Sequence, residues 1–311
     1  MASYLVTGGA GFIGSNIVAE LVHRGERVRV LDNFATGLRE NIVPFSDRIE
    51  IVEGSLTDLE TVRLAVRKID FVLHQGALPS VPRSIEQPIN SNEVNAGGTL
   101  NVLLASKDEG VNRVVLASSS SVYGNTDAPK KHEGLPPLPL SPYAVSKLSG
   151  EFYANVFYHL YGLSTIVLRY FNVFGPRQNP NSQYSAVIPK FIRAMMKGER
   201  PVIYGDGEQS RDFSFVDNVV HANLLATTAP KVDGQVMNIA CGESFTLLNL
   251  VSVLNRILGT SIEPVFQPVR KGDVLHSLAD ISKAKQWLAY TPRIRWEEGL
   301  QKTVEWYGRA T

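Results

Sequence analysis

The chain has 311 residues, 44% of them hydrophobic and 20% charged, which fits a folded protein with a large core. The formal net charge of +1 excludes a general attraction to nucleic acid or to an anionic membrane, so any anion must bind at a local site. Cys241 is the one cysteine, which excludes an internal disulfide. With no signal-peptide core and no apolar run of membrane length, we expect a cytoplasmic protein.

Strands and helices alternate along the first half of the sequence. We expect strands over residues 3–7, 27–32, 49–53, 70–75, 113–117 and 165–170, and helices over residues 12–24, 59–66, 92–108 and 143–160. Short β-rich runs separated by helix-length segments predict an α/β fold with a Rossmann-type doubly wound parallel sheet. Because crossovers are right-handed, the carboxyl ends of the strands meet at one edge, where ligands bind.

The sequence changes in character from Gly175 onward, where prolines become frequent and the expected helices become shorter. We therefore expect a second, smaller C-terminal lobe that binds substrate, formed by residues 173–212 plus 241–311. Residues 1–172 plus 213–240 would form the dinucleotide-binding domain.

A glycine-rich turn directly follows the first expected strand. Gly8, Gly11 and Gly14 permit a tight turn and the close approach of a pyrophosphate to a helix N-terminus, whose N–H groups and dipole favour an anion. Asp32 ends the second strand about 20 residues further on, where a ribose diol is bound in such folds. Because a carboxylate there repels a 2′-phosphate, the pattern predicts NAD rather than NADP. The alternative is a glycine turn that serves packing alone.

Tyr143 and Lys147 lie four residues apart, so a helix places both on one face. A nearby ammonium favours a phenolate, and we expect Lys147 to lower the pKa of Tyr143 and make it a proton acceptor. A serine hydroxyl from residues 118–120 would hold the same substrate oxygen. With 11 tyrosines in the chain, this spacing arises by chance about 0.4 times, so the pair decides nothing alone.

Together these motifs resemble the extended short-chain dehydrogenase/reductase family, and within it the UDP-glucose and UDP-N-acetylglucosamine 4-epimerases. The resemblance covers nearly the whole chain. Its further marks are residues 74–77, 80–81, 95–99, 118–124, 169–175, 205–207, 211–212, 270–273 and 276–283. The resemblance implies an NAD-dependent isomerase that oxidises C4 of a UDP-hexose, lets the 4-keto sugar turn over, and returns the hydride to its other face.

The resemblance also assigns roles to residues at matching positions. Tyr143 would be the catalytic base and acid, Lys147 would bind the nicotinamide ribose, and Ser119 would hold the 4-oxygen of the sugar. The residues expected at the cofactor are Gly8, Gly11, Phe12, Ile13, Gly14, Asp32, Asn33, Ser55, Leu56, Gln75, Gly76, Ala77, Asn95, Tyr143, Lys147 and Phe171. Those expected at the UDP-sugar are Ser119, Ser120, Ser121, Tyr143, Asn172, Val187, Tyr204, Arg211, Arg270, Asp273 and Ser277. Two arginines suit a diphosphate, because guanidinium groups match its oxygens.

Two departures from the family pattern bear on ligand and reaction. Ser55 stands where members usually carry an aspartate that reads adenine, so that contact is weaker or comes from Asp58. Residues 118–121 are all serines, whereas related 4,6-dehydratases need an acidic pair there and UDP-glucuronate decarboxylases a glutamate. The neutral run favours simple epimerisation.

Finer features bear on the sugar. Ser277 stands where some epimerases carry a bulky aromatic that restricts the C2 substituent, so it should leave room for an N-acetyl group; a plain surface serine is the alternative. Residues 179–189 and 276–283 resemble epimerases that accept N-acetylhexosamines. UDP-glucuronate 4-epimerases share the serine run, but residues 178–185 contain no arginine for a sugar carboxylate. The choice between glucose and N-acetylglucosamine stays open.

Other functions remain as alternatives. One is a net oxidoreductase or dehydratase acting on a nucleotide sugar, and a remote one is a non-catalytic NAD-binding protein. The histidines lack metal-ligand spacing, so we expect no metal site. We expect no nucleic-acid or membrane partner. Residues 103–109 and 152–160 would form a homodimer face, as the resemblance implies, although a buried core explains their apolar residues equally well.

Overall fold

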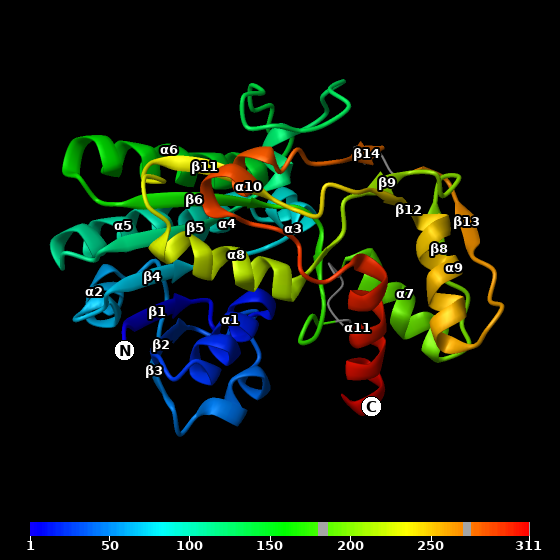
Figure 1. The fold of residues 1–311 in the computed structure, drawn as a ribbon, viewed down its shortest axis with the longest axis horizontal. Coiled ribbons are helices and arrows are strands. Elements are labelled where there is room, and N and C mark those ends of the chain that lie inside the picture. The colour runs from blue at the N-terminus through cyan, green and yellow to red at the C-terminus, as the bar shows by residue number, and fades with distance from the viewer. Residues whose placement is uncertain (180–185, 270–274, 311) are drawn as a thin grey trace.

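In the computed structural model, which describes residues 1–179, 186–269 and 275–310, seven strands form one parallel sheet (Figure 1). Its strand order is β11-β6-β5-β4-β1-β2-β3. The strands are β1 (Ser3–Thr7), β2 (Arg27–Asp32), β3 (Ile49–Glu53), β4 (Phe71–His74), β5 (Arg113–Ser119), β6 (Thr165–Tyr170) and β11 (Gln235–Ile239). The order reverses between β1 and β4, so the carboxyl ends of these two strands border a crevice where ligands bind in such sheets.

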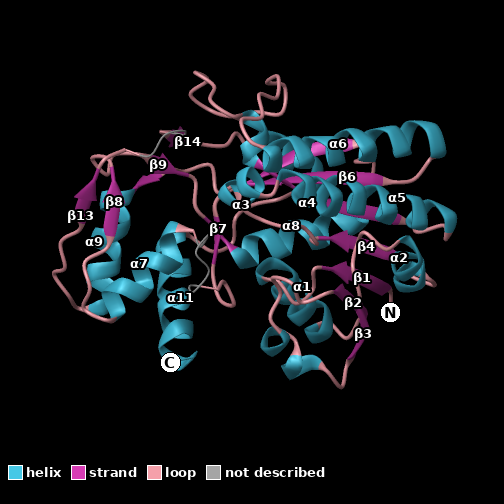
Figure 2. Ribbon diagram, turned by 180° about the vertical axis from the view of Figure 1, so that it is seen from behind, coloured by secondary structure: helices cyan, strands magenta, loops and turns pink. Residues whose placement is uncertain are grey.

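Helices cover both faces of this sheet, as the views from the two sides show (Figures 1 and 2). On one face, α1 (Phe12–His23) packs against α8 (Val216–Thr228). On the other face, α5 (Gly98–Asp108) packs between α2 (Leu59–Val66) and α6 (Pro142–Tyr161). The predicted doubly wound arrangement is therefore present.

The alternation of side chains along β1 explains the two apolar layers. Leu5 belongs to the buried cluster formed with α2 and α5, whereas Tyr4 and Val6 belong to the cluster formed with α1. Successive strand side chains point to opposite faces, and a strand buried on both faces must be apolar throughout. β1 is buried along its whole length.

The helix predicted over residues 92–108 begins differently in the structure. α3 (Val81–Glu86) and α4 (Pro88–Asn92) precede a π-helical turn, η3 (Glu93–Gly97), and only then does α5 start. Inside this turn the Asn95 side chain accepts from Leu78 N at 2.7 Å, and its backbone oxygen accepts from Thr99 Oγ1 at 2.6 Å. Such side-chain bonds compete with the regular helical pattern, and π-turns are frequent beside functional sites.

The C-terminal part of the chain forms small sheets beside the main one. Their strands pair as β7 (Val173–Phe174) with β10 (Ser214–Phe215), β8 (Val202–Tyr204) with β13 (Val265–Gln267), and β9 (Ser210–Arg211) with both β12 (Phe245–Thr246) and β14 (His276–Ser277). The helices α7 (Val187–Met196), α9 (Leu247–Leu258) and α11 (Trp296–Ala310) stand with these sheets (Figure 1), whereas α10 (Ser282–Leu288) packs on β11. The short 3₁₀ turns are η1 (Arg39–Asn41), η2 (Val43–Phe45) and η4 (Ser120–Tyr123).

Two regions bear on the expected boundaries. β5 extends to Ser119, so Ser118 and Ser119 end a strand where the sequence predicted them to follow it. Within residues 213–240, α8 packs against the large sheet and β11 is one of its strands, paired with β6 along its full length. The division into two domains stays a prediction.

Among the described residues, no helix is both long enough and apolar enough to span a bilayer.

Candidate active site

Tyr143 and Lys147 lie on α6 where it packs against β5, and the Tyr143 side chain makes a hydrogen-bonding contact with Ser119 at the end of that strand. Ser141 caps α6 by accepting from Ala144 N at 3.2 Å, and Pro142 occupies the first helical position, which places Tyr143 in the first turn. One turn later, Lys147 Nζ donates to the backbone oxygen of Ala117 in β5 at 2.9 Å. The helix is thereby joined to the strand that ends in Ser119.

The expected lowering of the Tyr143 pKa is wrong for this structure. Burial raises the pKa of Tyr143, and a hydrogen-bonding contact with Ser119 only opposes that shift. Burial also lowers the pKa of Lys147 to about 8, against the effect of Glu151. The physical reason is desolvation, which disfavours the charged form of both groups. The sequence predicted that the two would be neighbours, and it could not predict how deeply both would be buried.

The serine run contributes more than Ser119. The hydroxyl of Ser119 accepts from Ser121 N at 3.1 Å and so caps η4. The Ser121 hydroxyl is buried and has no hydrogen-bond partner within the described residues. Buried hydroxyls are rarely left unpaired in proteins, so Ser121 is well suited to receive a ligand group. Ser120 is half-buried.

The glycine turn is shaped for a dinucleotide. Gly8 has φ of +66°, and a Cβ there would lie 2.7 Å from Gly76 Cα, so a side chain would push apart the ends of β1 and β4. A Cβ at Gly14 would lie 2.1 Å from the backbone oxygen of Gly8. Gly11 precedes α1 without a side-chain cap, which leaves the N–H groups of its first turn to a ligand. These features fit a pyrophosphate at this helix N-terminus.

Asp32 ends β2 as predicted and has a structural role too. Its carboxylate is 8% exposed and accepts from Ala10 N at 2.9 Å and from Phe34 N at 2.8 Å. Burial raises the pKa of Asp32, and these two backbone bonds oppose that shift. Because each carboxylate oxygen can accept more than one hydrogen bond, ordering the turn leaves capacity for a ribose diol.

His74 ends β4 as a buried neutral imidazole. Its Nδ1 lies 2.6 Å from Thr7 Oγ1, and its Nε2 lies 3.0 Å from Thr99 Oγ1. Thr99 already donates to the backbone oxygen of Asn95, so its oxygen accepts from His74 Nε2, and Thr7 donates to Nδ1. Burial lowers the pKa of His74 to about 3. The imidazole thus ties β1, β4 and α5 together.

Several residues predicted to line the cofactor hold the sheet edge together. Gln75 donates to Asn223 Oδ1 at 3.0 Å and accepts from Tyr170 at 3.1 Å. Phe171 is fully buried, and its backbone N–H donates to the backbone oxygen of Ile239 at 3.2 Å. Leu56 is also buried. Phe12, Ile13 and Ala77 are half-buried, and Asn33 is exposed.

Ser55 and Asp58 are the two residues expected near the adenine, and that contact stays a prediction. Asp58 caps α2, accepting from Glu60 N at 3.1 Å and from Thr61 Oγ1 at 2.6 Å. Ser55 Oγ lies 2.8 Å from Thr57 Oγ1. Both candidates are engaged with their own loop.

Four residues predicted to hold the UDP-sugar line one cavity of ≈ 550 Å³, namely Asn172, Val187, Tyr204 and Arg211. Asn172 has φ of +32°, which is unusual for a non-glycine residue and is the kind of strain found at binding sites. Lys190, Phe213 and Leu247 line the same cavity, and sequence reasoning missed them. The spacing from Val187 to Lys190 on a helix was a signal that could have identified Lys190.

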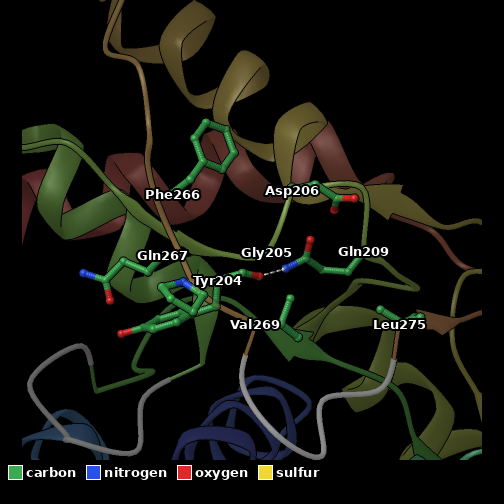
Figure 3. A pocket seen from close by; sticks show the side chains of 9 residues that line it. Tyr204, Gly205, Asp206, Gln209, Phe266, Gln267, Val269 and Leu275 are labelled. Carbon is green, nitrogen blue, oxygen red and sulfur yellow. Dashed lines mark hydrogen bonds between the residues drawn. The ribbon is translucent and has the colours of Figure 1, made fainter.

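A second cavity of ≈ 660 Å³ lies at the ends of the paired strands β8 and β13 and along the segments that follow them (Figure 3). Tyr204 and Phe266 both line this cavity, but their rings point to opposite faces of the strand pair; Gln209 Nε2 donates to the backbone oxygen of Tyr204 at 2.6 Å. Tyr204 and Gln209 line both cavities. The two hollows thus adjoin and together suit an elongated ligand with a flat end.

Arg211 and Ser277 face each other in register on β9 and β14. Ser277 is 5% exposed, so its interpretation as a plain surface serine is wrong. Asp212 is fully buried and accepts from Cys241 N and Gly242 N, both at 2.9 Å, and from Ala279 N at 3.3 Å. Burial raises the pKa of Asp212 to about 6. Asp212 thereby holds together the segments that present Arg211.

Two of the predicted substrate residues, Arg270 and Asp273, lie outside the described residues, as does much of the 179–189 segment.

The known proteins to which this chain is similar include nucleotide-sugar epimerases. Residues 4–240 match the model of the NAD dependent epimerase/dehydratase family. A UDP-glucose 4-epimerase of Mycolicibacterium smegmatis is 38% identical over 97% of both chains. Among solved structures, the UDP-N-acetylglucosamine 4-epimerase of Methanobrevibacter ruminantium M1, in complex with UDP-N-acetylmuramic acid, is 40% identical with a TM-score of 0.95, covering 100% of this chain and 99% of that one. A UDP-glucuronic acid 4-epimerase of Bacillus cereus, in complex with UDP-glucuronic acid and NAD, is 31% identical with a TM-score of 0.91, covering 99% and 100%.

Proposed function

Because the chain belongs to the NAD dependent epimerase/dehydratase family and uses NAD as its cofactor, we propose that it inverts C4 of a UDP-hexose through a transient 4-keto sugar. The observation that carries this proposal is the contact of Tyr143 with Ser119, next to Lys147 bonded to Ala117 in the same strand, at a run of serines that contains no acid. An acidic group there would open routes to dehydration or decarboxylation.

The roles of the side chains follow from their positions. The Tyr143 oxygen takes the proton of the 4-hydroxyl as C4 is oxidised, and it returns that proton when C4 is reduced. Ser119 holds the same oxygen and keeps it aligned with Tyr143. When bound, NAD⁺ supplies the acceptor for the C4 hydride and a positive charge that favours the Tyr143 phenolate. Lys147 anchors the cofactor beside Tyr143.

The nucleotide would be held more firmly than the sugar. The adjoining cavities share Tyr204, which offers an aromatic ring for a uracil, and Arg211 offers a guanidinium for the diphosphate. A 4-keto sugar must turn over between the two hydride transfers. Firm binding of UDP and loose binding of the hexose would permit that rotation without release.

We propose UDP-glucose and UDP-galactose as substrates, with UDP-GlcNAc and UDP-GalNAc also accepted. The proposal for the N-acetylhexosamines rests on the small side chain of Ser277, which is in register with Arg211. UDP-glucuronate is the second candidate, and the likeness to the Bacillus cereus enzyme favours keeping it.

We also propose that the chain works as a homodimer in the cytoplasm. Phe152, Val156 and Leu160 are exposed along α6, with exposed fractions of 61%, 43% and 71%. Large apolar side chains aligned on one helix face are typical of a covered surface. The single cysteine suits a reducing compartment.

The deciding experiment is to incubate the purified protein separately with UDP-galactose, UDP-GalNAc and UDP-glucuronate, without added NAD, and to resolve the C4 epimers. We expect products of unchanged mass and inverted configuration. A change in mass would instead indicate a dehydratase or an oxidoreductase. Absence of turnover on the whole panel, including with NAD added, would support a non-catalytic NAD-binding protein.

A further inference from the structure

A buried ion pair lies directly behind the Tyr143–Lys147 face of α6. Glu151 follows Lys147 by one helical turn, and its Oε1 and Oε2 accept from Arg169 Nε at 2.9 Å and from Nη2 at 2.6 Å. The side chains of Glu151 and Arg169 are only 4% and 6% exposed. None of the functions assigned above uses this pair.

The pair is connected to the serine run on two sides. Ser118, which directly precedes Ser119 in β5, donates its hydroxyl to Glu151 Oε1. The Arg169 guanidinium lies 4.7 Å from the ring centroid of Tyr123, the last residue of η4. The Tyr123 hydroxyl in turn donates to Asn238 Oδ1 at 2.7 Å. Glu151 and Arg169 therefore join α6 to β6 and to both ends of the segment that carries Ser119, Ser120 and Ser121.

Stability alone does not explain the pair. Taking two charges out of water costs several kcal/mol per ion, and buried pairs can often be replaced by apolar side chains without loss of stability. A buried pair next to a reactive group can have another use, because its charge acts strongly through an interior of low dielectric. Lys147 is the neighbouring reactive group.

The charges around Lys147 single out Glu151. Burial lowers the pKa of Lys147, and the Glu151 carboxylate is the charge that opposes this shift. His74 is neutral, and burial raises the pKa of Tyr143, so neither supplies a negative charge. The helices packed against α6 carry Arg83, Glu86, Glu93, Lys107 and Asp108, all at least partly exposed. Within the described residues, β5 carries a further cation only at its far end, Arg113.

We propose that Glu151 and Arg169 form a positioning pair for the reaction. Glu151 fixes the Lys147 face of α6 against the end of β5 and keeps the Lys147 ammonium charged. Arg169 holds the Glu151 carboxylate ionised and in place, and neither side chain touches the substrate. The inference rests on the proposed function, because it assigns the pair a part in hydride transfer at the same site.

The test separates this role from simple support of the fold. Glu151→Gln keeps the shape of the side chain but leaves Arg169 buried and unpaired, so it lowers stability whichever role is correct. The double variant Glu151→Gln/Arg169→Met removes both charges and should fold with a melting temperature near that of the wild type. Asp233→Asn is the matched control, since it removes the negative charge that lies 3.0 Å from the Arg113 guanidinium, at the opposite end of β5.

In the double variant we expect kcat at pH 8 to fall about fivefold, with the alkaline limb of the pH profile moved about one unit toward acid and KM unchanged. A second measurement needs no turnover. NMR of protein labelled with ¹³C-lysine, with the Lys147 signal assigned from Lys147→Arg, should show Lys147 titrating about one unit lower than in the wild type. Asp233→Asn should retain the wild-type limb and titration.

A folded double variant with the wild-type pH profile and Lys147 titration would overturn the proposal and leave the pair a structural element. Loss of activity in Glu151→Gln that the double variant fully restores would lead to the same conclusion. If the wild type turns over no UDP-sugar, the proposed function is wrong. The NMR titration would still decide whether Glu151 acts on Lys147.

Discussion

The cofactor edge of the sheet and the substrate cavities, which we propose form one site, are built differently. The cofactor edge is formed by the ends of adjacent strands, and Gly8, Asp32 and His74 each follow or end one of them. The substrate cavity gathers Asn172, Val187, Tyr204 and Arg211 from separate loops, strands and a helix. Two-residue strands and one buried carboxylate, Asp212, hold that side together.

This difference separates two ways of recognising a ligand. The cofactor edge depends on backbone shape, because the close approach of Gly8 to Gly76 leaves no space for side chains. The substrate side depends on side chains whose positions are set by contacts between distant segments. A change at the first should therefore damage folding and NAD binding together, and a change at the second should damage substrate binding alone.

The largest loss of activity is expected from a change at Tyr143, which lies between the two regions. Tyr143→Phe removes the oxygen that accepts and returns the proton and leaves the ring in place. We expect kcat to fall by about 10³-fold while NAD and UDP-sugar still bind. Turnover assays and calorimetric titration with UDP measure the two effects. Near wild-type turnover would contradict the mechanism.

Gly14→Ala should damage the cofactor edge. The added Cβ would lie 2.1 Å from the Gly8 backbone oxygen, so the turn must shift. We expect a loss of about 1 to 3 kcal/mol in the free energy of unfolding, with weakened NAD binding. Gly97→Ala is the control, because a Cβ there would meet nothing within 4 Å. Equal melting temperatures and NAD affinities for the two variants would contradict the packing argument.

Arg211→Gln should damage the substrate side alone. Removing one charged hydrogen-bonding group from the diphosphate should raise KM about tenfold and leave NAD affinity and melting temperature near those of the wild type. Arg256→Gln is the control, since Arg256 forms an exposed pair with Glu297 in the same part of the chain. An unchanged KM in Arg211→Gln would show that the diphosphate binds elsewhere.

Lowering the pH should change the free energy of unfolding in opposite directions through one group in each region, His74 at the cofactor edge and Asp212 on the substrate side. The pKa of His74 is lowered to about 3 in the folded state, so its contribution to stability is full above its unfolded value of 6.5 and is lost as the pH falls. The pKa of Asp212 is raised to about 6, so its contribution is full below 3.8 and is lost as the pH rises through about 6.

Between pH 7 and about 5.5, the His74 effect amounts to about 1 kcal/mol. We therefore expect His74→Gln to lose less stability than the wild type over this interval, and Asp212→Asn to lose more. Urea unfolding at several pH values measures both slopes. If the free energy of unfolding changed with pH at the same rate in the wild type, His74→Gln and Asp212→Asn, this distinction between the regions would be wrong.

Local patterns predicted much of the cofactor edge because neighbouring residues encode it. The glycine turn between strand and helix, Asp32 at a strand end, and the spacing of Tyr143 and Lys147 are each contained in a few consecutive residues. The structure gives these segments the predicted secondary structure and brings their strand ends to one edge. The bond of Gln75 to Asn223 and the full burial of Phe171 were not predicted, and the place of these two residues at the cofactor stays a prediction.

Sequence alone thus determined the parallel α/β sheet, its glycine turn and the helix that carries Tyr143, because short-range periodicity and turn chemistry specify them. Tertiary structure decided the burial that raises the pKa of Tyr143, the burial of Ser277 beside Arg211, and the Glu151–Arg169 pair behind Lys147. Each of these depends on how segments distant in the chain exclude water from one another. No local pattern of residues carries that information.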